Sequence, residues 1–460
     1  MSLIKSISGI RGTIGGKVND NLTPLDVVKF ASAFGTWLQN TQNKKDLTLV
    51  IGRDARISGE MVSSLVTATL QGLGIHVVDL GLSTTPTVEI MVPELNADGG
   101  IILTASHNPK QWNALKLLNG KGEFISGDDG AKVLALAESE DFNYAEVDDL
   151  GKYETRNDAF DIHIQQILDL PMVDVEAIKA KKFKIVLDAV NSTGGIAIPI
   201  LLDKLGCETI KLYCEPNGQF PHNPEPLKEH LGDICELVKK ENADLGIVVD
   251  PDVDRLALID EKGEMFGEEY TLVAVADYLL KHKKGIAVSN LSSSRALRDV
   301  ARNHDSEYFA SAVGEVNVVN LMKEKNAVIG GEGNGGIIYP DLHYGRDSLV
   351  GAALFLTHLA KENKTVSQLR AGYPEYFMGK KKIELTPEIN VDDILAKMEK
   401  EYQNEEVSTV DGVKIDFEKN WVHLRKSNTE PIIRIYTEAH SQEEADKLGD
   451  NIIAKIKSLI

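Results

Sequence analysis

Residues 245–255 have the sequence Leu-Gly-Ile-Val-Val-Asp-Pro-Asp-Val-Asp-Arg, an apolar run followed at once by three alternating carboxylates. A short run rich in Ile and Val is typical of a buried strand in a parallel sheet. Loops at the carboxyl ends of such strands are where open α/β sheets bind their ligands. This segment therefore predicts an α/β fold with a site at the end of the strand.

Apolar runs of this kind recur on both sides of this segment. Short Ile- and Val-rich runs alternate with helical patterns over roughly the first 370 residues, which is the signature of parallel α/β units. In residues 24–40, apolar side chains fall on one helical face and Pro24 stands in the first turn. Strands are expected at residues 47–51, 100–103, 184–187, 246–249 and 327–329.

Local signals also predict where helices begin. Ser58 is expected to cap a helix that begins at Gly59, and Thr193 with Gly194 to open another. Beyond about residue 372 the pattern changes to short strands at 381–385, 413–417 and 432–436, with helices at 391–402 and 441–460. The last helix starts with a capping box formed by Ser441 and Glu444.

These patterns predict an α/β protein with several domains, as a chain of 460 residues requires. Boundaries are expected where polar or Gly/Pro-containing stretches interrupt the pattern. The expected domains are three doubly wound-like α/β domains at residues 1–152, 153–257 and 258–372, followed by a small C-terminal α+β domain at residues 373–460.

Composition limits the possible partners. A net charge of −20 disfavours nucleic acid, which needs a broad basic surface, although a small anionic substrate is compatible with cations gathered in one cleft. No stretch looks like a signal peptide or a membrane span, so we expect a cytoplasmic protein without a membrane partner. The three cysteines, Cys207, Cys214 and Cys235, suggest neither a disulfide framework nor a zinc site, and we expect partly or fully buried thiols.

A serine-containing loop, T-A-S-H-N-P at residues 104–109, follows the strand expected at 100–103. Ser106 stands beside His107 and ahead of Lys116, so its hydroxyl can act as a nucleophile or carry a phosphoryl group. The same residue types are also good turn formers. The loop alone leaves both interpretations open.

The acidic loop at residues 250–255 carries Asp250, Asp252 and Asp254, followed by Arg255. Alternate side chains of an extended loop point to the same side, so three hard oxygen ligands can converge on one divalent cation. A solvated acidic turn is the weaker interpretation, because unpaired carboxylates at the end of a buried strand would repel one another. The loop lacks the glycine and distal glutamate of a calcium EF-hand, and Mg²⁺ is the expected ion.

Two further loops carry polar groups. In the glycine-rich stretch at residues 330–336, Glu332 and Asn334 offer the acceptors and donors that sugar hydroxyls require, although glycine-rich turns are common. The segment R-K-S-N-T-E-P at 425–431, with Arg434 three residues on, gathers the groups that bind a phosphate monoester. An exposed charged turn is the alternative interpretation for this last segment.

In this order and at these distances, the four loops resemble those of the α-D-phosphohexomutase superfamily, and the similarity spans nearly the whole chain. G-I-R-G-T at residues 9–13 and G-R-D-A-R-I-S-G at residues 52–59 also match motifs of that superfamily. The resemblance implies three α/β domains and a smaller C-terminal domain, arranged around a central cleft that receives one loop from each. This architecture agrees with the domains expected from the pattern.

The resemblance also implies the reacting groups. Ser106 is expected to be carried phosphorylated, and its phosphate to bind Mg²⁺ together with Asp250, Asp252 and Asp254. The other groups expected around the reacting atoms are Arg255 as a stabiliser of the phosphoryl group, Lys116 and Arg11 as acid/base or electrostatic aids, and His107 as a lining residue. Substrate contacts are expected from Glu332, Gly333 and Asn334 in the sugar loop, and from Arg425, Ser427, Asn428, Thr429 and Arg434 in the phosphate loop.

The implied activity is that of a phosphosugar mutase, which moves phosphate between carbons 1 and 6 of a hexose and is activated by a hexose 1,6-bisphosphate. Two departures from the usual motifs are Asn334 with Gly336, where serine and histidine are common, and Pro251 with Val253 in place of glycines. Both are typical of an archaeal-type branch, with counterparts in some bacteria, commonly assigned as phosphoglucosamine mutases.

We therefore expect interconversion of glucosamine 6-phosphate and glucosamine 1-phosphate, by a monomer or a homodimer. The close alternative is a phosphomannomutase/phosphoglucomutase of relaxed sugar specificity. A sugar-phosphate phosphatase would release inorganic phosphate, and a non-catalytic binder should have lost the serine or the acidic loop. Because this chain retains both, the non-catalytic binder ranks low, and the phosphatase is also the less expected activity.

Overall fold

The computed structural model describes residues 2–6, 9–42, 44, 46–384, 390–426 and 432–459. The chain divides into two compact units, Met1–Thr271 with Asn334–Leu369, and Leu272–Gly333 with Arg370–Ile460. The expected four-domain boundaries stay a prediction. Over the described residues, no helix combines the length and the apolar character needed to cross a lipid bilayer.

The first unit contains a seven-stranded sheet with the order β1-β2-β6-β5-β3-β4-β7. Its central strands β5, β3 and β4 are parallel, whereas β1, β2 and β6 are antiparallel to their neighbours. The strands are β1 (Ile4–Ser6), β2 (Gly9–Thr13), β3 (Thr48–Arg53), β4 (His76–Leu82), β5 (Gly99–Leu103), β6 (Trp112–Asn119) and β7 (Tyr153–Thr155). The accompanying helices are α1 (Pro24–Gln42), α2 (Gly59–Gly72), α3 (Thr85–Glu94), α4 (Gly127–Ser139) and the short η1 (Val147–Asp149).

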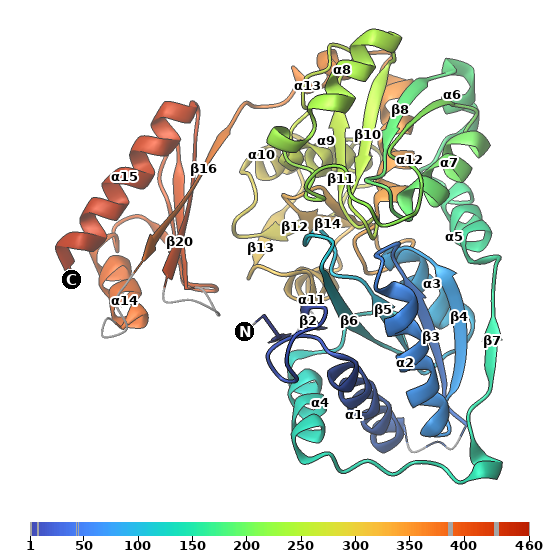
Figure 1. Ribbon diagram of the computed structural model, residues 1–460. Helices are drawn as coiled ribbons and strands as arrows, with labels where there is room; N and C mark the ends of the chain where they lie inside the picture. Colours follow the sequence, from blue (N-terminus) through green and yellow to red (C-terminus); the bar gives the residue numbers. More distant parts are fainter. Residues whose placement is uncertain are drawn as a thin grey trace. The chain divides into compact units, whose positions relative to one another are not determined.

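Alternate residues of this sheet face two different cores. Leu49 and Ile51 of β3 belong to a core that includes side chains of α1, α2 and α4, whereas Val50 between them packs with α3. Because successive side chains of a strand point to opposite faces, a strand covered on both sides must be apolar throughout. Helices therefore lie on both faces of the sheet (Figure 1).

A second sheet of the first unit has the order β11-β10-β8-β9, with β10 parallel to β8 and antiparallel to β11. Its strands are β8 (Lys184–Asp188), β9 (Glu208–Leu212), β10 (Leu245–Val249) and β11 (Leu256–Ile259). The helices of this part are α5 (Ala159–Leu168), α6 (Val175–Lys181), α7 (Gly194–Lys204), η2 (Lys228–His230) and α8 (Gly232–Glu241). Outside this sheet, later segments of the chain form β15 (Gly336–Ile338), α12 (Ser348–Glu362) and α13 (Val366–Arg370).

In the second unit, β12 (Ala287–Asn290) lies between β13 (Tyr308–Ser311) and β14 (Ile329–Glu332), parallel to both. The helices of this part are α9 (Glu268–His282), inside which the division falls, α10 (Ala296–Asn303) and α11 (Glu315–Lys325). The polar residues that end β12 and β14 lie at the carboxyl edge of these parallel strands, where ligands are expected.

The rest of the second unit is an antiparallel sheet with the order β16-β20-β19-β18-β17. Helices α14 (Val391–Glu401) and α15 (Gln442–Leu459) share one hydrophobic core with it (Figure 1). This is the small α+β tail expected from the sequence. Its strands are β16 (Phe377–Glu384), β17 (Glu406–Ser408), β18 (Val413–Asp416), β19 (Trp421–Lys426) and β20 (Ile432–Ala439).

Some local expectations are wrong. Ser58 precedes α2, but its side chain makes no cap hydrogen bond and its oxygen instead accepts from Asn113 Nδ2 at 2.9 Å. The strand expected at residues 327–329 begins only at Ile329. Arg425, expected in a loop, lies in β19, a strand that the sequence pattern did not indicate.

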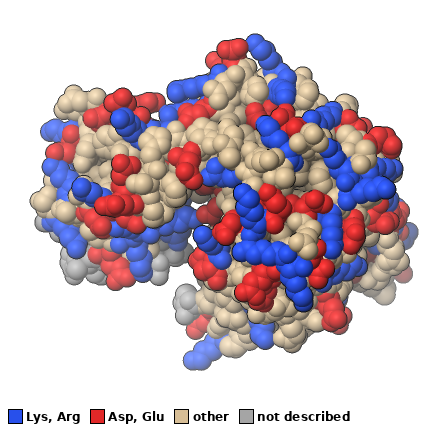
Figure 2. Space-filling view, turned by 90° about the horizontal axis from the view of Figure 1, so that it is seen from above, with Lys and Arg blue, Asp and Glu red and all other residues tan. Residues whose placement is uncertain are grey.

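Other local expectations hold. Half of the capping box of α15 is present, since the Glu444 N–H donates to Ser441 Oγ at 3.2 Å. All three cysteines are free and partly buried, and burial raises the pKa of Cys207 and Cys214 to about 12. Figure 2 shows basic and acidic side chains interspersed over the visible face.

Candidate active site

The serine loop, which we define as residues 104–112, joins β5 to β6. Ser106 has a φ of +50°, in the left-handed region that residues other than glycine seldom adopt. Its N–H donates to Thr104 Oγ1 at 2.9 Å, and Thr104 Oγ1 donates to Asp54 Oδ2 at 2.6 Å. These contacts hold Ser106 in a backbone conformation that serine, as a residue with a Cβ, does not favour.

Arg56 fixes the same loop from the end of β3. Its guanidinium has five N–H groups, and the structure supplies an acceptor for each of them. The acceptors are the Asp54 carboxylate and the main-chain carbonyls of Ser106, Asn108, Pro109 and Trp112. The ion pair of Arg56 with Asp54 is completely buried, with Nε 2.9 Å from Oδ2. Burial raises the pKa of Asp54, and the neighbouring Arg56 opposes this shift.

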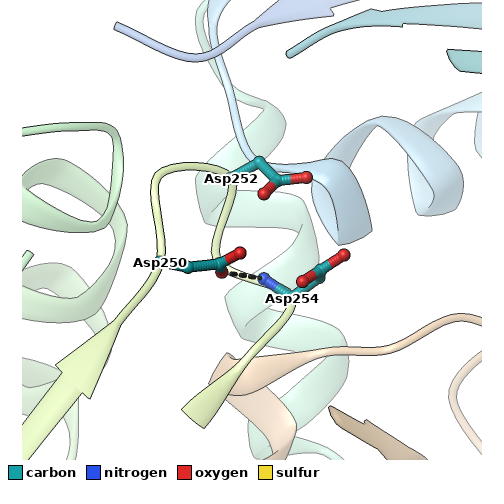
Figure 3. Close-up of side chains that lie close together, drawn as sticks. All are labelled: Asp250, Asp252 and Asp254. Carbon is teal, nitrogen blue, oxygen red and sulfur yellow. Dashed lines mark hydrogen bonds between the residues drawn. The ribbon is translucent and has the colours of Figure 1, made fainter. Parts of the chain in front are cut away.

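The acidic loop follows β10 and brings its three aspartates close together (Figure 3). All three carboxylates are fully buried. Asp250 Oδ1 accepts from the backbone N–H groups of Asp254 and Arg255, each at 3.1 Å. Asp250 Oδ2 accepts from the Ser106 hydroxyl at 2.9 Å. The nucleophile candidate Ser106 therefore lies in direct contact with one metal-ligand candidate, Asp250, which is more than a hundred residues away in sequence.

The three carboxylates fit a divalent cation. Ligand oxygens of Asp250, Asp252 and Asp254 lie within 4.8 Å of one another, the one such group among the described residues. Asp252 Oδ2 accepts from Lys116 Nζ at 2.7 Å and Asp254 Oδ2 accepts from Arg346 Nη2 at 2.7 Å. The Oδ1 atoms of Asp252 and Asp254 are buried and have no hydrogen-bond partner in the described part of the chain. Buried carboxylate oxygens without donors are suited to a hard cation such as Mg²⁺.

Charges around the acidic loop shift several pKa values. Burial raises the pKa of Asp250, and the charges of Asp254 and Asp252 raise it further. For Asp252, burial acts upward, but the charge and hydrogen bond of Lys116, together with hydrogen bonds to Thr85 and Asp250, outweigh it and hold the pKa below its usual range. Burial alone would lower the pKa of Lys116, yet Asp252 and Asp254 raise it above the ordinary value. Lys116 therefore carries its charge at neutral pH.

His107 lines the same place without a charge. Its Nδ1 lies 3.4 Å from Ser106 Oγ. Burial, together with the positive charges of Arg255 and Arg346, lowers the pKa of His107 to about 2. A neutral imidazole beside Ser106 can donate or accept a hydrogen bond but adds no charge to the site.

Two further predicted residues lie beside these groups. Arg255 is nine-tenths buried and donates from Nη1 to Glu225 Oε1 at 3.1 Å. Arg11 in β2 stands opposite Ala114 of β6. Because residues two apart in a strand share a face, Arg11 and Lys116 occupy diagonal positions on one face of the sheet. The structure thus brings Ser106, His107 and Lys116 together with the acidic loop and Arg255, and positions Arg11 on the strand next to that of Lys116.

The predicted sugar loop is divided between the two units. Glu332, at the end of β14, accepts from Asn290 Nδ2 at 2.9 Å and from the Gly314 N–H at 3.2 Å, and the Gly333 N–H donates to Ser293 Oγ at 3.0 Å. Asn334 belongs to the first unit, where its Oδ1 accepts from the Gly336 N–H. The role of these residues in sugar binding stays a prediction.

The predicted phosphate loop lies partly outside the described residues, because Ser427, Asn428 and Thr429 fall there. Arg425 in β19 stands directly opposite Arg434 in β20. Like charges in this position destabilise a sheet, and phosphate binding by this pair stays a prediction. Arg425 Nε also donates to Asp411 Oδ2 at 2.8 Å, whereas Arg434 is exposed.

Sequence reasoning missed several residues that contact the site. Arg346 touches Asp254, Thr85 donates to Asp252 Oδ2 at 2.5 Å, and Glu225 pairs with Arg255. None of these three residues lies in a sequence motif whose spacing would have indicated a site. Arg56 does lie within one of the quoted motifs, so the resemblance marked the segment although it assigned no role to the side chain.

Val253 in the acidic loop is a strained position with a testable consequence. It is fully buried and has a φ of +64°, which costs a residue with a Cβ roughly 1–2 kcal/mol. Val253→Ala loses the two γ-methyl groups and Val253→Gly loses Cβ as well, but only glycine relieves the strain. We expect Val253→Gly to be about 1 kcal/mol more stable than Val253→Ala in thermal unfolding.

The matched control for this prediction is Val248 in β10, which is 1% exposed and whose φ is not positive. There Ala should be more stable than Gly, because glycine weakens a strand interior. The same order of stability at both positions would contradict the strain at Val253.

The sequence matches four domain families described for phosphoglucomutase/phosphomannomutase. These are α/β/α domain I over residues 4–144, α/β/α domain II over 161–263, α/β/α domain III over 267–376 and the C-terminal domain over 382–455. Together they cover most of the chain.

Whole-chain relatives carry related names. A phosphoglucomutase/phosphomannomutase of Thermococcus kodakarensis is 37% identical over 94% of this chain and 95% of its own length. A phosphoglucosamine/phosphogalactosamine mutase of Sulfurisphaera tokodaii is 32% identical over 100% of this chain and 99% of its own length. Among solved structures, a phosphoglucomutase/phosphomannomutase family protein of Burkholderia thailandensis matches with a TM-score of 0.85 at 25% identity, covering 99% of this chain and 98% of its own.

Proposed function

Because the chain belongs to the phosphoglucomutase/phosphomannomutase family, which consists of phosphohexomutases, we propose that it interconverts glucosamine 6-phosphate and glucosamine 1-phosphate through a phosphoserine at Ser106. The observation that carries the proposal is the 2.9 Å contact of Ser106 Oγ with Asp250 Oδ2. This contact puts the atom that would carry the phosphoryl group beside buried carboxylates able to hold a divalent cation.

The proposed reaction begins with the phosphoryl group on Ser106 Oγ. The free hydroxyl of a hexosamine monophosphate attacks phosphorus, the Oγ–P bond breaks and the new sugar O–P bond forms. The sugar hydroxyl loses its proton and the freed Ser106 Oγ gains one, so that Ser106 is left as a neutral hydroxyl. The resulting 1,6-bisphosphate turns around, and its other phosphate returns to Ser106 by the reverse exchange. Phosphate is conserved at each step, so the net reaction is an isomerisation.

Protein groups stabilise the charge that develops on the transferring phosphoryl group. Asp250, Asp252 and Asp254 would hold Mg²⁺, which when bound supplies positive charge to the phosphoryl oxygens. Lys116 keeps its proton and so serves as an electrostatic aid near the reacting hydroxyl. Arg255 has a buried Nε without a hydrogen-bond partner among the described residues, which is available to an anionic oxygen.

Names of relatives support glucosamine as the sugar, and one relative favours a second candidate. The Sulfurisphaera tokodaii protein is named for glucosamine and galactosamine phosphates, whereas the more similar Thermococcus kodakarensis protein is named for glucose and mannose phosphates. A phosphoglucomutase/phosphomannomutase of relaxed specificity is therefore the alternative. A hexose 1,6-bisphosphate is the proposed activator, since it can phosphorylate an unmodified Ser106.

The test is a direct comparison of sugars. Purified protein with Mg²⁺ and a trace of hexose 1,6-bisphosphate is assayed on glucosamine 6-phosphate, mannose 6-phosphate and glucose 1-phosphate, while released phosphate is measured in parallel. We expect the fastest isomerisation with glucosamine 6-phosphate and none after chelation of Mg²⁺. Faster turnover of mannose or glucose phosphates would select the alternative, and release of phosphate without isomerisation would refute a mutase.

A further inference from the structure

Arg346 lies next to the acidic loop although no motif indicated it. Its Nη2 donates to Asp254 Oδ2 at 2.7 Å, and it is 8% exposed. The backbone directly after Arg346 is held in place, because the Asp347 N–H donates to the Ile337 carbonyl and the Ser348 N–H to the Val253 carbonyl. Asp347 also caps α12 through the N–H groups of Leu349 and Val350. The guanidinium is therefore presented to Asp254 from a rigid segment.

The stem of Arg346 occupies the space that a side chain at position 336 would need. A Cβ added to Gly336 would lie 2.3 Å from Arg346 Cδ and 3.0 Å from its Cγ, well inside van der Waals contact. Position 336 is one of the two places where the sugar loop departs from the superfamily pattern, which often has histidine there. The presence of glycine at position 336 is therefore explained by packing, because only glycine leaves room for the side chain of Arg346.

The three carboxylates are held in a similar way. In each, at least one oxygen accepts from donors of the protein: backbone N–H groups for Asp250, Lys116 and Thr85 for Asp252, and Arg346 for Asp254. The second oxygen of Asp250 accepts from the Ser106 hydroxyl, so it is Asp252 and Asp254 that keep an oxygen without a donor among the described residues. Lys116 lies 3.7 Å from Asp254 Oδ2, farther than Arg346. Groups that hold the non-coordinating side of a metal ligand fix its orientation. For Asp254 this group is Arg346.

We propose that Arg346 is a positioning residue of the metal site, which fixes Asp254 so that Oδ1 remains available to the cation, and that Gly336 is required to admit its side chain. The inference rests on the proposed function, since it assumes that the acidic loop binds a divalent cation. Gly336 and Arg346 would thus affect the affinity for the metal although neither of them is a metal ligand.

The test measures binding of Mn²⁺ alone to the full-length protein by electron paramagnetic resonance, without sugar or turnover. Arg346→Met is expected to weaken Mn²⁺ binding about 10–100-fold, and Arg346→Lys to restore part of the loss through its ammonium group. Gly336→Ala should weaken binding in the same direction, because the new methyl group displaces the arginine stem. The double variant should bind no more weakly than Arg346→Met, since Gly336 acts through Arg346.

The matched control is Arg156→Met, because Arg156 forms an arginine–aspartate pair with Asp158 on the surface, at 34% and 49% exposure. Mn²⁺ binding by this variant should equal that of the wild type. If Arg346→Met does not fold, Gly336→Ala carries the test. A loss below about fivefold, or additive losses in the double variant, would overturn the inference. Absence of Mn²⁺ binding by the wild type would instead refute the metal site and, with it, this inference.

Discussion

Ser106→Ala is expected to lower the isomerisation rate by ~10⁴-fold or more, because the variant lacks the oxygen that would carry the phosphoryl group. The hydroxyl makes one strong contact, with Asp250 Oδ2, so its removal should leave the fold intact. The rate is measured with the preferred sugar at saturating Mg²⁺. Intact-protein mass spectrometry after incubation with a hexose 1,6-bisphosphate should detect one added phosphate in the wild type and none in Ser106→Ala.

The matched control for this prediction is Ser126→Ala. Ser126 caps α4 through the Asp129 N–H, so its loss should cost about 1 kcal/mol of stability and leave the rate unchanged. Retention of a tenth or more of the wild-type rate by Ser106→Ala would refute the phosphoserine mechanism. Phosphate on a different residue of the wild type would refute the assignment of Ser106.

Arg56→Met is expected to be the most destabilising single substitution near the site, at about 3–5 kcal/mol. It removes a buried guanidinium that donates to four carbonyls of the serine loop and leaves the Asp54 carboxylate buried without its partner. The thermal unfolding midpoint measures the loss of stability. Hydrogen exchange of residues 104–112 should show that protection of the serine loop falls more than that of β5.

A second variant separates stability from catalysis. Asp54→Asn combined with Arg56→Met removes both charges, so part of the lost stability should return. The isomerisation rate should stay low, because the serine-loop carbonyls still lack their donors. Full recovery of the rate in the double variant would contradict the role of Arg56 in holding the loop. A decrease of less than about 1 kcal/mol in the free energy of unfolding of Arg56→Met would contradict the expected contribution of Arg56 to stability.

Much of the fold and the acidic loop could be predicted from the sequence because their signals are local. A strand buried on both faces has to be apolar at every position, so β3, β5, β8 and β10 appear as short apolar runs. Asp250, Asp252 and Asp254 lie at alternate positions directly after one such strand, and their spacing alone suggests convergence on a cation. Ser106 is marked by its polar loop after another strand.

Strands with polar residues and the pairing between strands were harder to predict. β19 carries His423 and Arg425 among its apolar residues, so the end of the strand looks like the start of a charged loop. Its pairing in register with β20, which sets Arg425 opposite Arg434, depends on contacts between segments rather than on either segment alone. The failed cap at Ser58 has the same cause, since Asn113 from a distant strand hydrogen-bonds the hydroxyl.

The sequence by itself determined which segments form α/β units, which loop carries the metal-ligand candidates and which serine is the candidate nucleophile, because each depends on neighbours within a few residues. Only the tertiary structure decided which side chains hold those groups. Arg346 is about ninety residues from Asp254, and Gly336 is explained only by the path of that arginine. Such contacts have no period or spacing in sequence, because they depend on how separate segments pack.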